Sequence, residues 1–279
     1  MTPYPMDDLK DRCSRILLLA PLLLMSACTQ AAFTAANLPT HLVEMAVEHD
    51  QVYGPEPSQK LDIYVPANTK NKLMDVVVFF YGGRWTYGAK EDYRFVAATF
   101  VKEGFVVVIP DYRKYPQVRF PVFVEDGAKA LSWASDHIAE FHGDPTRVHV
   151  VGHSAGAHIG ALLAADPHYL ADEGKDRSLT IHDFSGLAGP YAFTPDEPDL
   201  EDMFSPPQNY PNMQVTTFNE APRSKLRGIT ELKHVELPEI IAGLSLPLHI
   251  PLDCLPVRSL SYRGHIVPIG PKFSTPQHS

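Results

Sequence analysis

Cysteine is scarce in this sequence, and positive charge is in the minority. The chain of 279 residues has three cysteines and no Cys-x-x-Cys pair, so neither a disulfide framework nor a cysteine-based metal site is expected. Its 24 Lys and Arg face 33 Asp and Glu, which leaves a net charge of −9. Proteins that bind nucleic acid need basic surfaces for their phosphate contacts, so this balance argues against that class.

The apolar run near the N-terminus lacks the length of a membrane span. Residues 16–25 (ILLLAPLLLM) would extend about 15 Å as a helix, half of the roughly 30 Å hydrocarbon core of a bilayer. Three basic residues precede the run: Lys10, Arg12 and Arg15. A charged start, a short apolar stretch and small residues after it predict a signal peptide over residues 1–28, and hence an exported protein.

The end of this segment, Met25 to Cys28, resembles the lipobox of bacterial lipoproteins, in which the cysteine becomes the lipidated first residue of the mature chain. Cys28 is therefore the predicted lipidation site, with residues 29–42 as a tether and the lipid anchor as the contact with the membrane. Three acids are unusual in such a leader: Asp7, Asp8 and Asp11. The alternative is plain cleavage near Ala32, which gives a periplasmic protein.

Apolar residues are plentiful, at 44% of the chain, which is enough for a sizeable globular core. Three runs are apolar on both faces, as in strands that helices cover on both sides: residues 76–81, 105–110 and 148–151. Helical spacing lies between and after these runs, over residues 91–102, 122–138 and 155–165. This alternation predicts an α/β fold with a mostly parallel central sheet and helices on both faces.

Two further segments alternate between apolar and polar residues ahead of that pattern, at residues 43–47 and 61–65. A turn sequence, Gly54-Pro55-Glu56-Pro57, lies between them. They are predicted to form antiparallel N-terminal edge strands. The sequence therefore indicates one α/β domain over residues 43–279.

The strand at residues 148–151 leads into Gly152-His153-Ser154-Ala155-Gly156 and then straight into a helix. A Gly-x-Ser-x-Gly sequence between a buried strand and a helix is typical of a nucleophile elbow, a turn so sharp that only small residues fit beside the serine. The turn lifts the hydroxyl to the carboxyl edge of the sheet. Ser154 is the predicted nucleophile.

Acyl transfer also needs hydrogen-bond donors for the oxyanion that forms on the attacked carbonyl. The backbone N–H of Ala155 is one candidate, because it lies at a helix N-terminus where the dipole favours negative charge. The run at residues 76–81 ends in paired glycines, Gly82 and Gly83, followed by Arg84. These glycines let the backbone approach a substrate closely, so the N–H groups of Gly83 and Arg84 are the other predicted donors.

From about residue 53 to residue 193 the sequence resembles the α/β-hydrolase-fold serine esterases of the carboxylesterase, hormone-sensitive-lipase and arylformamidase-like group. The resemblance is carried by LDIYVP, VVVFFYGGRW, DYRKYP, VRFPVFVEDGAKALSWASDHI, GDPTRVHVVGHSAGAHIGALLA and SGLAGPYAF. It implies the α/β-hydrolase fold, hydrolytic chemistry on a small-molecule substrate, and no cofactor or metal. One departure is Tyr81, which stands where the family usually has a histidine before the paired glycines.

The remaining members of a catalytic triad follow the serine in the order acid, then histidine. His265 lies in VRSLSYRGHIVPIG, which resembles the family's last strand and histidine loop, and is the predicted base. The acid is harder to place. Glu236 precedes His265 by about the 25 to 30 residues that the intervening elements need, and Glu239 is the second candidate. The family's apolar strand, Gly and Asp are not recognisable around either, and a solvated surface charge is the competing interpretation.

Composition changes in the last third of the chain. Of 26 prolines, 14 lie from Pro190 onward, and residues 221–279 carry seven Lys and Arg against four Asp and Glu. Within this stretch, residues 219–256 look atypical for the fold. A compensated frameshift is one hypothesis, and a lineage-specific replacement is the other.

These observations predict a serine hydrolase that cleaves carboxylic esters through an acyl-enzyme, with a substrate pocket built by the loops at residues 86–93 and 194–213. One alternative keeps the machinery and cleaves the N-formyl amide of an arylformamidase substrate. The other is a non-catalytic hydrolase-fold binding lipoprotein that has lost its triad acid.

Overall fold

The structure, a computed structural model, describes residues 31–67, 72–215 and 260–261. The predicted signal peptide with Cys28, the atypical segment at residues 219–256 with Glu236 and Glu239, and His265 all lie outside these ranges. The described residues contain no helix long and apolar enough to cross a bilayer.

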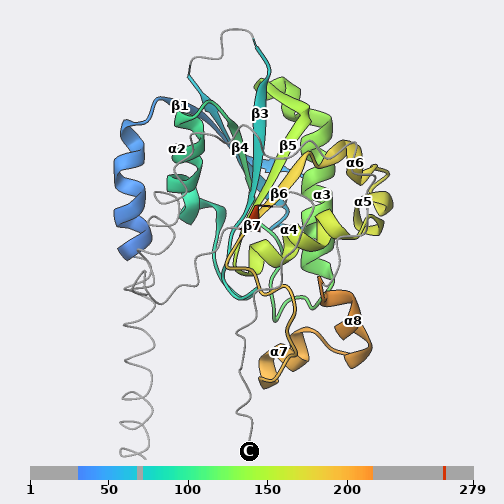
Figure 1. The fold of residues 1–279 in the computed structure, drawn as a ribbon. Coiled ribbons are helices and arrows are strands. Elements are labelled where there is room, and N and C mark those ends of the chain that lie inside the picture. The colour runs from blue at the N-terminus through green and yellow to red at the C-terminus, as the bar shows by residue number, and fades with distance from the viewer. Residues whose placement is uncertain (1–30, 68–71, 216–259, 262–279) are drawn as a thin grey trace, which may run out of the picture.

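A seven-stranded mixed sheet forms the centre of the molecule (Figure 1), in the order β1-β2-β4-β3-β5-β6-β7. Its strands are β1 (Met45–Val52), β2 (Lys60–Pro66), β3 (Met74–Phe80), β4 (Val106–Pro110), β5 (Gly143–His153), β6 (Asp183–Leu187) and β7 (Leu260–Ser261). The central strands β4, β3, β5 and β6 pair in parallel. β1 and β2 pair antiparallel at one edge, and the short β7 pairs antiparallel with β6 at the other.

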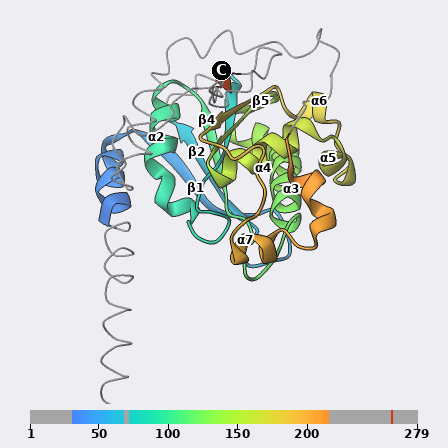
Figure 2. The same ribbon diagram turned by 60° about the horizontal axis from the view of Figure 1, so that its bottom comes forward.

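Helices cover both faces of this sheet. The α-helices are α2 (Arg94–Lys102), α3 (Val122–His137), α4 (Ala155–Ala165), α5 (His168–Asp172), α6 (Arg177–Thr180), α7 (Pro198–Met203) and α8 (Tyr210–Met213). Short 3-10 helices are η1 (Leu38–Leu42), η2 (Lys90–Tyr93), η3 (Ile138–Phe141) and η4 (Pro207–Asn209). α2 lies on one side of the sheet, and α3 and α4 lie together on the other (Figures 1 and 2). The predicted arrangement of sheet and helices is confirmed.

The double-sided apolar runs explain this layering. All residues of β4, and Val76 to Phe80 of β3, are buried, because helices pack on both faces of these strands. α4 contributes small side chains such as Gly156 and Gly160, which let it approach β3, β5 and β6 closely. The helix predicted over residues 91–102 is divided into η2 and α2.

The N-terminal segment differs from the expected tether. Residues 31–37 are helical, and η1 continues them. Phe33 is buried, with its ring centroid 5.2 Å from that of Tyr93. The amide of Asn37 donates to the carbonyl of Asp92 at 3.0 Å, and its side-chain oxygen accepts from the N–H of Phe95 at 2.9 Å. Hydrogen bonds at the start of α2 therefore draw this segment onto the domain.

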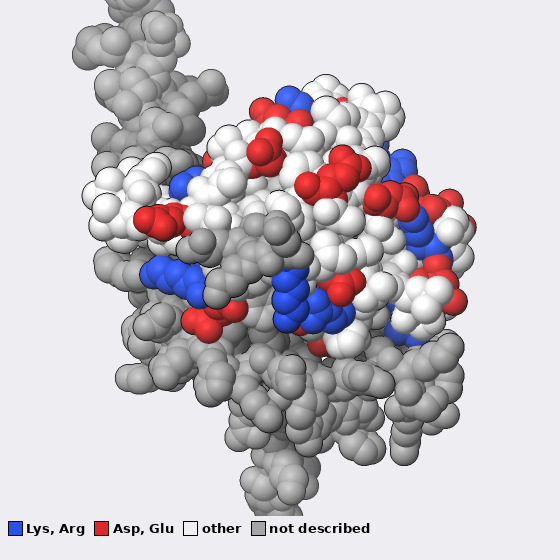
Figure 3. All heavy atoms as spheres, turned by 90° about the horizontal axis from the view of Figure 1, so that it is seen from above, with Lys and Arg blue, Asp and Glu red and all other residues white. Residues whose placement is uncertain are grey.

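Acidic and basic side chains are interspersed on the described part of the face in Figure 3. Several charged side chains of the described residues form ion pairs. Arg147, for example, binds Asp144 at 2.8 Å and also pairs with Asp75. The described residues contain no group of three or more His, Cys, Asp or Glu that could hold a metal ion.

Candidate active site

Ser154 lies in the sharp turn between β5 and α4. Its backbone has φ 52° and ψ −118°, a region that residues with a side chain rarely occupy and that costs about 1–3 kcal/mol. Such a conformation persists only where the surroundings fix it. The N–H of Ser154 donates to the carbonyl of Leu187 at 2.8 Å, and the N–H of His158 donates to the Ser154 carbonyl at 3.1 Å.

Neighbouring backbone atoms leave no room for a side chain at the two glycines of the elbow, Gly152 and Gly156. A Cβ at Gly156 would lie 2.1 Å from the carbonyl oxygen of Phe80, and a Cβ at Gly152 would lie 2.5 Å from the carbonyl oxygen of Gly156. Both contacts are with backbone, which cannot swing away as a side chain could. The Gly-x-Ser-x-Gly pattern therefore has a steric reason here: α4 begins hard against the ends of β3 and β5.

The oxyanion loop, which we define as residues 81–93, runs from the end of β3 to α2 and passes beside the elbow. A Cβ at Gly82 would lie 3.1 Å from the Cβ of Ser154, which puts the two backbones in close contact. Gly83 has φ 128°, and Arg84 follows with φ 52°. Gly82 thus lies beside Ser154, and the predicted donors Gly83 and Arg84 follow it directly in the chain.

Three backbone N–H groups in this region make no backbone hydrogen bond to the part of the chain that the structure describes. Within the described residues, the N–H groups of Gly83, Arg84 and Ala155 donate none of the backbone hydrogen bonds. Ala155 is the first residue of α4, so its N–H has no intrahelical acceptor.

An aromatic cluster supports the oxyanion loop from within. Trp85 is buried, and its ring centroid lies 5.1 Å from Phe204, 5.3 Å from His158 and 5.9 Å from Phe193. Phe204 lies within residues 194–213, the stretch that the sequence predicts as a pocket wall, and Phe193 directly precedes that stretch. This stretch is ordered into α7, η4 and α8, which lie together at one end of the sheet (Figures 1 and 2).

Charged contacts tie α7 to the same loop. The guanidinium of Arg84 lies 2.5 Å from Glu197 and 3.2 Å from Asp199. Asp202, also on α7, binds Arg119 at 2.7 Å and accepts from the hydroxyl of Tyr115 at 2.9 Å. Glu197 and Asp199 therefore hold the side chain of Arg84, a residue of the oxyanion loop.

Two histidines lie close to the nucleophile in the chain: His153 is half-buried and His158 is fully buried. Burial lowers the pKa of His153 to about 4, and its Nδ1 has no hydrogen-bond partner among the described residues. Burial also lowers the pKa of His158 to about 4, although a hydrogen bond at 2.7 Å to the carbonyl of Met213 acts in the opposite direction. His158 of α4 thus binds α8. The predicted base, His265, and both candidate acids, Glu236 and Glu239, lie outside the described residues.

The structure also shows a group that the motifs do not reveal. The hydroxyl of Tyr81, at the end of β3, hydrogen-bonds the carboxylate of Asp111, which follows β4. Both residues end neighbouring parallel strands, and the carboxyl ends of such strands meet at one edge of a sheet. The position of Tyr81 and Asp111 directly after two apolar strands is the feature of the sequence from which this contact could have been predicted.

A sheet of this order with a strained serine between a parallel strand and a helix defines an α/β-hydrolase fold. A family model described as BD-FAE matches residues 61–185. Isoprenylcysteine alpha-carbonyl methylesterase of Arabidopsis thaliana is 32% identical over 173 residues, which are 61% of this chain and 39% of that protein. Esterase LipC of Mycobacterium tuberculosis is 33% identical over 161 residues, 56% of this chain and 38% of that protein.

Solved structures agree on the fold. Esterase B from Lactobacillus rhamnosis superposes with a TM-score of 0.56 at 21% identity, over 71% of each chain. The apo form of Thermogutta terrifontis esterase 2 has a TM-score of 0.52 at 25% identity, over 63% of this chain and 68% of that one. The chain spans about two fifths of the length of the two curated relatives above.

Proposed function

We propose that this protein is a serine hydrolase that cleaves carboxylic esters through an acyl-enzyme. The observation that carries the proposal is the strained backbone of Ser154 at the end of β5, with the oxyanion loop packed against it. Backbone strain of this kind clusters at active sites, and N–H donors beside a serine stabilise the oxyanion that forms when it attacks a carbonyl.

In the proposed reaction, Ser154 Oγ attacks the ester carbonyl and His265 takes the hydroxyl proton. The carbonyl electron pair moves to the oxygen, which the N–H groups of Gly83, Arg84 and Ala155 stabilise. The alcohol then leaves with the proton from His265, and the serine keeps the acyl group. Water, deprotonated by His265, attacks the acyl-enzyme and releases the acid. Glu236, with Glu239 as the alternative, orients His265.

The substrate is proposed to be a small carboxylic ester. The name of the Arabidopsis relative specifies a methylesterase, and that of the Mycobacterium relative an esterase. Methyl esters and p-nitrophenyl esters of short acids are therefore the first substrates to test.

The test is hydrolysis of p-nitrophenyl acetate by the wild type and by Ser154→Ala. We expect turnover in the wild type and a loss of at least 10³-fold in the variant, since the nucleophile is removed. A fluorophosphonate probe should label the wild type at Ser154 and leave the variant unlabelled. A wild type that neither hydrolyses short esters nor reacts with the probe favours the non-catalytic binding protein and rules out the proposal.

We further propose export, with a lipid anchor at Cys28. The support is the basic start, the short apolar run and the Met-Ser-Ala-Cys sequence. Expression in a bacterial host with radiolabelled palmitate tests this directly. Incorporation that Cys28→Ala abolishes supports the anchor, whereas a mature N-terminus near Ala32 identifies plain signal-peptidase cleavage.

A further inference from the structure

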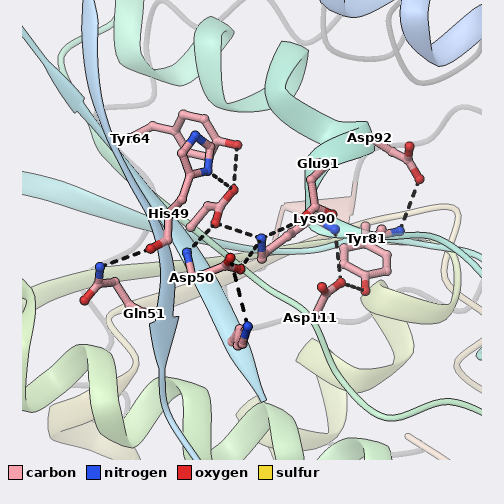
Figure 4. Close-up of polar contacts among 12 residues, drawn as sticks. His49, Asp50, Gln51, Tyr64, Tyr81, Lys90, Glu91, Asp92 and Asp111 are labelled. Carbon is pink, nitrogen blue, oxygen red and sulfur yellow. Dashed lines mark hydrogen bonds and ion pairs between the residues drawn. The ribbon is translucent and has the colours of Figure 1, made fainter. Parts of the chain in front are cut away.

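The carboxylate of Asp111 lies where the two ends of the oxyanion loop come together. The hydroxyl of Tyr81, the first residue of the loop, donates to Asp111 Oδ1. The backbone N–H of Lys90, close to the loop's other end, donates to the same Oδ1 at 3.0 Å. Figure 4 shows Tyr81 and Lys90 approaching this carboxylate from two sides. The side chain of Asp111, which follows β4, therefore binds both ends of the oxyanion loop.

The backbone of this loop needs such a closure. Gly83, Arg84, Trp85 and Gly88 all have φ between 52° and 128°. Arg84 and Trp85 carry side chains, and each such residue costs about 1–3 kcal/mol in this region. The loop's own backbone hydrogen bonds are few: the N–H groups of Thr86 and Tyr87 share the carbonyl of Gly83, and the N–H of Asp92 donates to the carbonyl of Ala89. Contacts from outside the loop must therefore hold its shape.

The phenol of Tyr81 is fixed in the orientation that reaches Asp111. Its ring stacks between Tyr93, at 5.1 Å, and Tyr112, at 4.9 Å. The hydroxyl of Tyr112 also donates to the backbone carbonyl of Tyr81 at 2.9 Å. Burial raises the pKa of Tyr81 well above its usual value, so the phenol keeps its proton and acts as the donor. Lys114 Nζ lies 5.3 Å from the ring centroid.

The other end of the loop is anchored twice. While the backbone of Lys90 binds Asp111, its ammonium is buried and lies 2.9 Å from Asp62, 3.0 Å from Asp50 and 2.5 Å from Glu91. Asp62 is a buried residue of β2, which pairs with β4. Figure 4 shows these groups converging on the lysine. Lys90 is thereby fixed to the sheet through both its main chain and its side chain.

We propose that Asp111 is a positioning residue for the oxyanion loop, and that the Tyr81 phenol is the group through which it holds the strained turn at Gly83 and Arg84. The catalytic consequence rests on the proposed function. In this chain a phenol stands where related esterases usually have an imidazole, and its bond to Asp111 keeps the donors aimed at Ser154. Neither Asp111 nor Tyr81 touches the reacting atoms in this account.

The test uses the full chain with Tyr81→Phe and the matched variant Tyr53→Phe. Tyr81→Phe keeps the stacked ring and removes only the hydroxyl. Tyr53 also carries a phenol that binds Asp111, but its hydroxyl donates to the backbone carbonyl at 2.5 Å and not to the carboxylate. Amide hydrogen exchange of the peptides that cover residues 81–93 is measured by mass spectrometry.

We expect these peptides to exchange about tenfold faster in Tyr81→Phe, since a hydrogen bond to a charged group is lost, and at the wild-type rate in Tyr53→Phe. Asp111→Ala, which removes the acceptor for both loop ends, should exchange at least as fast as Tyr81→Phe. Equal exchange in wild type and Tyr81→Phe overturns the positioning role. This readout does not depend on catalytic activity.

The catalytic consequence is measured with p-nitrophenyl acetate. We expect kcat to fall about tenfold in Tyr81→Phe, less than the 10²–10³ that follows removal of an oxyanion donor, with KM nearly unchanged. Inhibition by phenylboronic acid, whose adduct with the serine places an oxygen among the donors, should weaken in parallel. Faster exchange with unchanged kcat overturns the catalytic part. An inactive wild type refutes the proposed function, and hydrogen exchange still decides the loop.

Discussion

The guanidinium of Arg84 lies 2.5 Å from the carboxylate of Glu197, and this ion pair joins the oxyanion loop to the segment that carries α7. Asp199 adds a second carboxylate at 3.2 Å. The same residue supplies a proposed backbone donor and a side-chain link to a predicted pocket wall. Arg84 thus couples the position of α7 to the oxyanion loop.

Removal of this link should slow catalysis modestly. Exposed ion pairs contribute about 0.2–1 kcal/mol each, so the double variant Glu197→Gln with Asp199→Asn is expected to lower kcat/KM about twofold to tenfold. The wild type should lose part of the same factor in 1 M salt, which screens exposed charges. Steady-state kinetics on a short ester measure both effects.

The control is Asp136→Asn, which removes the exposed ion pair of Asp136 with Lys175 away from α7. That variant should keep the wild-type kcat/KM and salt response. An equal loss in both variants would show that the effect of the α7 carboxylates is only general charge.

Gly156→Ala should destabilise the fold strongly. The new Cβ would lie 2.1 Å from a carbonyl oxygen of the sheet, and overpacking against backbone costs at least about 3 kcal/mol. For a chain of this size we expect Tm to fall by about 6–12 °C. Thermal unfolding followed by circular dichroism measures the shift.

Gly160→Ala is the matched control on the same helix. Its Cβ would meet the ring of Phe184 at 2.9 Å, a side chain that can move, and alanine favours the helix by about 1 kcal/mol. Its Tm should stay within about 3 °C of the wild type. Similar losses at both positions would contradict the steric account of the elbow.

His149 should make stability depend on pH at the alkaline side. Burial lowers its pKa, but hydrogen bonds with Asp183 at 2.9 Å and Asp75 at 3.4 Å outweigh burial and raise the pKa to about 9. Because the folded pKa exceeds the unfolded value near 6.5, the stabilisation is complete below about pH 6.5 and is lost as pH rises through 9. Its size is on the order of 2–4 kcal/mol.

The measurement compares the free energy of unfolding of the wild type and of His149→Gln between pH 6 and pH 10. Other groups titrate in both proteins, so the difference between the two curves isolates His149. We expect a large difference at pH 6 to 7 that shrinks toward pH 10. A difference independent of pH would show that His149 is neutral in the folded protein.

The strands and helices around the nucleophile follow from local patterns. Double-sided apolar runs such as residues 76–81 can be satisfied only under helices on both faces, and the pattern predicted α4 at its exact bounds, Ala155–Ala165. The nucleophile elbow could also be predicted from the sequence, because a strand-turn-helix of this shape leaves no room for a side chain at its two glycines. Burial and steric contacts between residues close in the sequence restrict which residue types can occupy these positions, so the pattern is visible in the sequence.

Other features depend on partners far away in the chain. The N-terminal residues 31–42 carry no strong pattern, and their docking rests on contacts such as Asn37 with Phe95. The links from Arg84 to Glu197 and from Tyr81 to Asp111 join residues that are distant in sequence. No local rule selects which acid meets which base when several of each are present.

The sequence by itself determined the α/β architecture, the nucleophile candidate and the glycines that the turn demands, because periodicity and steric exclusion act between near neighbours. Tertiary structure alone decided which groups contact the oxyanion loop, since Asp111 and Glu197 reach it from the end of β4 and the start of α7, far away in the sequence. A strained backbone conformation persists only where contacts from the surrounding structure fix it, and here those contacts come from residues far away in the sequence.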